Sequence, residues 1–95
     1  MSGVKLTAAQ RRMVGLIRVE AIVRAGQALY GWRSIVRTVA TVDEGRAVQA
    51  SMAKEYGRSL KCPVAIEVCD GRAWRNVDSD AGRAALATSK EPARG

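Results

Sequence analysis

The sequence predicts a small, single-domain α+β protein with the element order α-β-α-β-β. Three features predict this class. They are a capping box at the start of a run with helical spacing, a segment rich in β-branched residues, and an Asp-Gly pair between two short segments near the C-terminal end. We expect a short sheet that ends in a C-terminal β-hairpin, with two helices packed on the sheet.

The first element is expected to be a helix over residues 8–28. Thr7 and Gln10 have the spacing of a capping box, in which two side chains satisfy backbone N–H groups at a helix start. Apolar residues then recur near helical spacing. An alternative exists within residues 17–23, where apolar residues alternate with Arg18 and Glu20 as they do in a half-buried strand. The capping box and the length of the run favour the helix.

Residues 32–42 are expected to form a strand, because β-branched residues dominate the segment. Arg33 and Arg37 share one face of this strand, and Trp32 lies on the other. Trp32, with Tyr30 before it, is expected to anchor the corner between the first helix and the strand.

A second helix is expected to follow this strand and to stop at Gly57. Thr41 and Glu44 form a second possible capping box, with Asp43 as an alternative cap. Gly45, in the first turn, is expected to add no packing and to weaken the helix start slightly.

The Asp-Gly pair at 70–71 is expected to form the two-residue turn of a hairpin, between a strand that ends at Cys69 and a returning strand at 72–77. Such a turn places Cys69 opposite Arg72, and the rest of the register follows. One face of the hairpin is then mostly aliphatic, and the other carries Trp74 beside Arg72.

The 95 residues are expected to divide into a compact basic domain at 1–77 and a short tail at 78–95 that is weakly helical or disordered. A body of this size buries only about 60% of the surface that its unfolded chain exposes. Stability should therefore be modest, and a homodimer or a bound partner would increase it.

We expect a cytoplasmic protein. No apolar run approaches the roughly 18 residues of a membrane span, and no secretory signal pattern is present. If the segment between Cys62 and Cys69 is extended, the two residues lie roughly 23 Å apart, too far for a disulfide. Reduced thiols fit a cytosolic setting, and the spacing does not match a CxxC motif.

The formal net charge is +7, and it is unevenly distributed. Residues 1–37 carry seven basic side chains and one acidic side chain. A positive field of this kind favours acidic partners, namely nucleic acid, an acidic protein or a nucleoprotein complex. The alternative is a basic charge that serves solubility alone.

The composition argues against an enzyme, a metal site or a bound cofactor. The chain has no histidine, the commonest general base and metal ligand, and no glycine-rich phosphate-binding motif. Two carboxylate pairs, at 43–44 and 78–80, are more simply explained as helix caps.

Trp74 beside Arg72 suggests a surface that stacks a base or anchors a protein contact. The alternative, that the first helix covers Trp74, is slightly favoured. Arg33 and Arg37 could track phosphates or acidic side chains, or form an ordinary solvated strand face. The candidate binding residues are Arg33, Arg37, Arg72, Trp74, Arg11 and Arg18, the last two on one face of the first helix.

Two functions are consistent with this pattern. The first is a non-enzymatic protein that binds nucleic acid or a nucleoprotein complex through its basic residues. The second is a protein–protein interaction module that acts as an inhibitor or accessory factor, of the kind that phages and other mobile elements encode. A third function, an enzyme that acts through carboxylates or the thiol of Cys69, has the weakest support.

Overall fold

The computed structural model describes residues 5–24 and 31–90, and it confirms the α+β class. Of the two helices expected on the sheet, the second is present there, as is the hairpin near the C-terminal end. The elements in chain order are α1 (Ala8–Met13), β1 (Ile17–Arg24), β2 (Trp32–Val39), α2 (Val42–Tyr56), the 3-10 turn η1 (Gly57–Ser59), β3 (Ala65–Cys69), β4 (Trp74–Asn76) and α3 (Asp80–Lys90).

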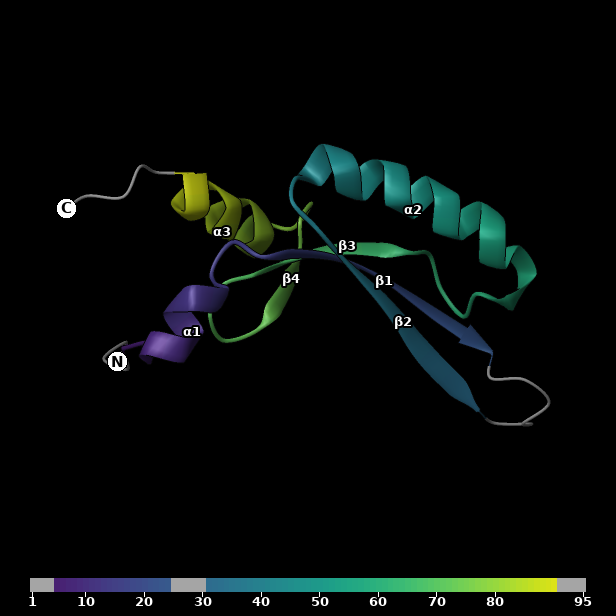
Figure 1. The fold of residues 1–95 in the computed structure, drawn as a ribbon, viewed down its shortest axis with the longest axis horizontal. Helices are drawn as coiled ribbons and strands as arrows, with labels where there is room; N and C mark the ends of the chain where they lie inside the picture. The colour runs from purple at the N-terminus through teal and green to yellow at the C-terminus, as the bar shows by residue number, and fades with distance from the viewer. Residues whose placement is uncertain (1–4, 25–30, 91–95) are drawn as a thin grey trace.

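The four strands form one antiparallel sheet in the order β2-β1-β3-β4. β1 is therefore an inner strand, paired with β2 on one side and with β3 on the other. α2 and α3 both lie on the same side of this sheet, whereas α1 lies at its end (Figure 1). The architecture is two layers, with the helices covering one face.

The prediction of a helix over residues 8–28 is wrong beyond Met13. The capping box of Thr7 and Gln10 is present, but α1 ends after less than two turns. Gly15 follows with a φ of 89°, and β1 begins at Ile17. The alternating pattern, and not the helical one, describes this segment. The described elements therefore have the order α-β-β-α-β-β-α, and residues 25–28 of the expected helix lie outside the described part.

The core lies between the sheet and the two covering helices. Every second residue of β1 is buried, and these side chains pack with aliphatic residues of β3 and with Met52 of α2. Val39 and Ala85 extend the cluster at β2 and α3. Alternation follows from strand geometry, since successive side chains point to opposite faces. The core residues on β1 are Ile17, Val19, Ala21 and Val23.

α2 begins and ends as the sequence predicts. The Thr41 hydroxyl accepts the N–H of Glu44 at 3.0 Å, and Gly57 ends the helix with a φ of 40°. The expectation for Gly45 is wrong, because this residue is buried against the sheet. A Cβ at this position would lie 3.2 Å from Cγ2 of Ile66. The missing side chain therefore allows a close approach of α2 to β3.

The β3–β4 hairpin is present, but its turn is longer than predicted. Cys69 lies opposite Trp74, not Arg72. The Asp70 carboxylate accepts the N–H groups of Arg72 and Ala73, each at 2.8 Å, and so holds a four-residue turn at 70–73. The register is shifted by two residues, and an even shift leaves each side chain on its predicted face.

α3 extends from Asp80 to Lys90 and packs on β3 and β4. The Ser79 hydroxyl accepts the N–H of Gly82 at 3.0 Å at the start of this helix. Ala85 is part of the hydrophobic core. The boundary predicted at residue 77 thus falls between β4 and a helix on the same sheet, and residues 91–95 lie outside the described part.

Candidate functional site

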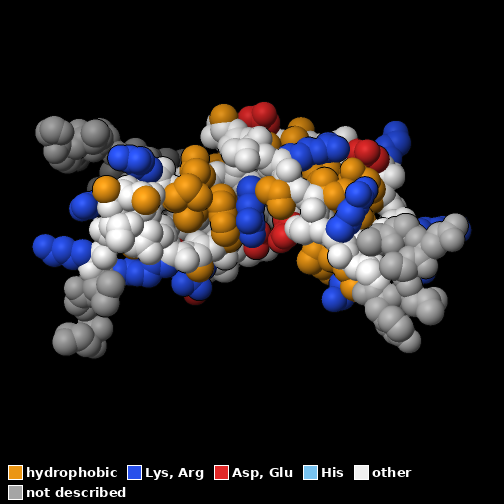
Figure 2. Space-filling model, turned by 60° about the horizontal axis from the view of Figure 1, so that its bottom comes forward, with side chains coloured by type: hydrophobic (Ala, Val, Ile, Leu, Met, Phe, Trp, Pro, Cys, Tyr) orange, Lys and Arg blue, Asp and Glu red, His pale blue; other side chains and the backbone are white. Residues whose placement is uncertain are grey.

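The face of the sheet opposite α2 and α3 carries no helix in the described part of the chain, and we call it the open face. The residues of β1 that alternate with the buried ones point to it, and the strand register adds their neighbours. Figure 2, in which this side is turned forward, shows hydrophobic, basic and acidic side chains beside one another. The open face contains Arg18, Glu20, Ile22, Arg24, Trp32, Ser34, Val36, Thr38, Ala65, Glu67, Trp74 and Asn76.

One cluster of the open face is centred on Arg18. Its guanidinium lies 4.3 Å from the ring centroid of Trp74, and its Nε is 2.9 Å from Oε1 of Glu67. A second carboxylate, that of Glu20, lies 4.0 Å away and also accepts the hydroxyl of Ser34. The charge of Arg18 is therefore neutralised within the sheet, while Trp74 is half-buried beside it.

A second cluster lies at the far end of β1 and β2 and is centred on Trp32, which is 42% exposed. The Arg24 guanidinium lies 5.8 Å from the ring centroid, and the Lys61 ammonium lies 5.4 Å from it. Within the described residues, neither cation pairs with a carboxylate. We call these three residues the Trp32 cluster.

The backbone explains how the Trp32 cluster forms. Arg24 is directly opposite Trp32 in the β1–β2 register, so the two side chains share one face. Lys61 comes from the segment before β3, and its N–H donates to the carbonyl of Ile22 at 2.8 Å. An isolated bridge between Val23 and Leu60 fixes the same segment against β1.

The predicted grouping of Arg33 and Arg37 with Trp74 is wrong. Both arginines lie opposite buried residues of β1, which places them on the helix-covered side of β2. Arg37 pairs there with Glu55 of α2 at 3.4 Å. A single binding surface on the open face therefore excludes these two arginines.

The remaining predicted residues are also separated. Arg11 is exposed on α1, and Arg18 is on β1, not on a common helix face with Arg11. Arg72 is in the β3–β4 turn and not on a strand beside Trp74. Among the six residues, Arg18 contacts Trp74, and it does so from strand β1 and not from the first helix that the alternative placed over Trp74.

The carboxylate of Asp70, which holds the β3–β4 turn, has a strongly lowered pKa. The pKa of Asp70 is lowered to about 2, first by the hydrogen bond from Arg75 and then by the N–H groups of Ala73 and Arg72. The Arg75 Nε lies 2.9 Å from this carboxylate. The shift is explained by structural hydrogen bonds and does not require a catalytic role.

Sequence reasoning missed Trp32, Arg24 and Lys61. Trp32 was assigned to a corner because a helix was expected to lead into it. The signal that identifies Arg24 is the alternation of residues 17–23, which places it two residues beyond Ile22 on the same face. No local pattern indicates Lys61, because its position depends on the pairing of Leu60 with Val23.

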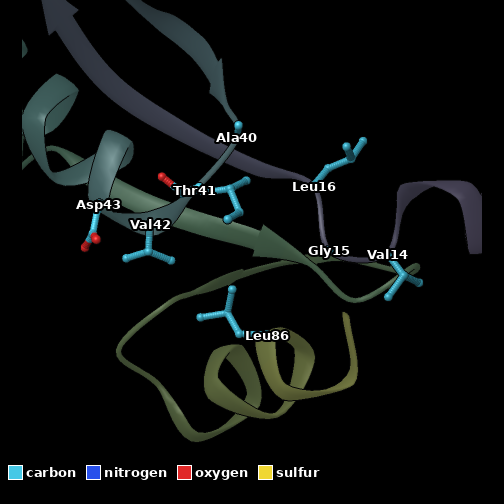
Figure 3. A pocket seen from close by; sticks show the side chains of 9 residues that line it. Val14, Gly15, Leu16, Ala40, Thr41, Val42, Asp43 and Leu86 are labelled. Carbon is cyan, nitrogen blue, oxygen red and sulfur yellow. The ribbon is translucent and has the colours of Figure 1, made fainter. Parts of the chain in front are cut away.

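A pocket lies on the helix-covered side, between the start of α2, the segment before β1, and α3 (Figure 3). Its volume is about 600 Å³, and its walls are mostly aliphatic. Thr41 and Asp43 supply its polar side chains, and the hydroxyl of Thr41 already caps α2. The pocket holds no pairing of a nucleophile with a base.

The described residues contain no group of three or more potential metal ligands. Cys62 is exposed and Cys69 is buried, and both are free thiols. No helix in the described part of the chain has the length and apolarity needed to cross a membrane.

Comparison with protein-family models, with curated proteins and with solved structures finds no match to this chain. The open face and its two clusters are thus the features on which a functional interpretation rests.

Proposed function

We propose that this protein is a non-enzymatic nucleic-acid-binding protein that holds a single strand on its open face, with a base stacked on Trp32. One observation supports the proposal above all others: Trp32 is 42% exposed on a sheet face that no described helix covers, and the two cations beside its ring pair with no carboxylate of the described residues. Stacking of a base on an aromatic side chain contributes about 1–3 kcal/mol, and neighbouring cations attract the phosphates.

The dimensions of the open face suit a short single strand. Arg24 lies beside Trp32 and Arg18 beside Trp74, and the six steps along β1 from Arg18 to Arg24 span about 20 Å at about 3.3 Å per residue. At the spacing of about 3.4 Å between stacked bases, this distance corresponds to about six nucleotides. The net charge of +7 adds long-range attraction for the strand.

The proposal includes a cytoplasmic location, where both free thiols would remain reduced.

The test is fluorescence anisotropy with a labelled single-stranded decamer of DNA and one of RNA, measured at 50 mM and 200 mM salt. We expect Trp32→Ala to weaken binding about tenfold or more, because stacking is lost. We expect Arg24→Gln to weaken binding and to reduce the slope of log K against log salt by about 0.7, the value for one phosphate contact on a single strand.

Lys54→Gln is the matched control, because it removes one positive charge from an exposed position of α2 on the other side of the molecule. Its affinity should stay within about twofold of the parent, since no phosphate contact is lost. Absence of single-strand binding at 50 mM salt, or equal affinity of the parent and Trp32→Ala, would contradict the proposal.

A protein partner is the second candidate function, and Glu20 and Glu67 favour it. These acids neutralise Arg18 in the middle of the open face, where a nucleic-acid surface would keep its charge. A face that mixes Trp, Arg and apolar residues also resembles a protein-binding hot spot. An inhibitor or accessory factor would use it to bind a target complex. Capture of a stoichiometric protein partner that survives nuclease treatment, and that Trp32→Ala abolishes, would favour this function.

A further inference from the structure

The sheet has two edges of very different length. β4 pairs over three residues at one edge, whereas β2 forms the other edge along eight. In the described part of the chain, β2 pairs only with β1. The outer side of β2 therefore presents a row of backbone N–H and C=O groups, which is a template for a further strand.

β2 lacks three of the features that commonly prevent edge pairing, although it carries two arginines that point to the helix-covered side. It contains no proline and no lysine, and its register with β1 continues through eight successive pairs without a bulge. Its charged residues, Arg33 and Arg37, lie on the helix-covered side, and Arg37 is paired with Glu55. On the open face, β2 carries only uncharged side chains, and Val36 is 45% exposed.

We propose that β2 pairs with β2 of a second copy, antiparallel about a two-fold axis at Val36, to form a continuous eight-stranded sheet. The two-fold axis is perpendicular to the sheet, so the open faces of both copies lie on the same side. Each residue that points to the open face is then opposite a residue of the second copy that also points to it. The proposal does not depend on nucleic-acid binding and is tested separately from it.

Charge selects this register over its neighbour. Two registers keep the open faces on the same side and pair most residues of β2. One is centred on Ile35 and the other on Val36. The first places Arg33 directly opposite Arg37 of the second copy, and like charges in that position are destabilising. The register centred on Val36 places each arginine opposite an aliphatic residue and brings the two exposed Val36 side chains together.

A second copy suits the edge of β2 better than an unrelated peptide does, because its side chains match those of β2 on the open face. On the open face, the same register places Ser34 opposite Thr38 of the second copy, a favourable cross-strand combination. The interface is isologous, so one strand supplies both complementary halves.

The register is tested by disulfide trapping in a Cys62→Ser background, which removes the exposed native thiol. Val36→Cys should give a covalent dimer under mild oxidation, because the two cysteines would face each other within the 4.4–6.8 Å Cα separation of a disulfide. Thr38→Cys is the matched control on the same face. Its two copies would lie about 13 Å apart along the strands and should stay reduced.

Native mass is the second readout. We expect the parent to have twice the 10.2 kDa mass of the chain in light scattering at about 100 µM, and Val36→Lys to restore the monomer mass by placing like charges at the axis. A monomeric parent would overturn the proposal. Equal trapping of Val36→Cys and Thr38→Cys, or preferential trapping of Ile35→Cys, would overturn the register.

Discussion

At the scale of single residues, Asp70 shows how one carboxylate determines local structure. It accepts two backbone N–H groups of the β3–β4 turn and the Nε of Arg75. All three bonds favour the ionised form, which is why the pKa of Asp70 is lowered to about 2. The Asp70 side chain thus holds a four-residue turn, in place of the two-residue turn that an Asp-Gly pair usually indicates.

Asp70→Ala should lower the free energy of unfolding by about 1–2 kcal/mol at pH 7, because the turn loses its acceptor. Since the folded pKa is below the unfolded one, the contribution is complete above pH 4. It is then lost as the pH falls through about 2. Urea unfolding of parent and variant at pH 7, 4, 3 and 2 measures this. A difference between them that stays constant down to pH 2 would contradict the assignment.

The residues of the candidate site could be predicted only in part from the sequence. Arg18 and Trp74 were identified individually, but their contact was not, because Arg18 was assigned to a helix. Arg33 and Arg37 were assigned to the binding surface because both are basic and share one face of the predicted strand. The alternation along a strand shows which of its residues share a face. Which of the two faces the helices cover depends on the packing of the whole chain.

At the scale of elements, the main error concerns β1. The capping box at Thr7 is correct, but it determines where a helix begins and not how far it continues. β1 is stabilised by pairing with β2 and β3, and its inner face is buried by α2. These contacts involve residues distant in sequence, which a local window does not contain. The α2 boundaries were predictable because both caps are local.

The docking of α3 depends on Gly82. A Cβ built there would lie 1.8 Å from the carbonyl oxygen of Asn76, which is backbone and cannot move away alone. Gly82→Ala should therefore displace α3 and cost about 3 kcal/mol or more. Gly45→Ala is the matched comparison on α2. Its Cβ would lie 3.2 Å from a side-chain methyl group of Ile66, and its cost should be smaller. Thermal unfolding of both variants gives the order, and the reverse order would contradict this packing.

At the scale of the whole molecule, the structure separates two kinds of surface. The helices cover one face of the sheet and enclose the core, while the open face retains both tryptophans. Ion pairs with acidic side chains also separate the basic residues into two groups. Arg18, Arg37, Arg46, Arg75 and Arg83 are paired with acids, whereas the cations beside Trp32 pair with no acid in the part of the chain that the structure describes. Net charge alone did not reveal this division, because it depends on which residues the fold brings together.

The central claim, that a base stacks on Trp32, is tested most directly by the fluorescence of Trp32 itself. The chain has two tryptophans, so Trp74→Phe leaves Trp32 as the single indole while keeping an aromatic ring beside Arg18. We predict that a single-stranded decamer quenches this fluorescence to saturation and that added salt restores it. Saturable binding of the decamer with unchanged Trp32 fluorescence would contradict the claim.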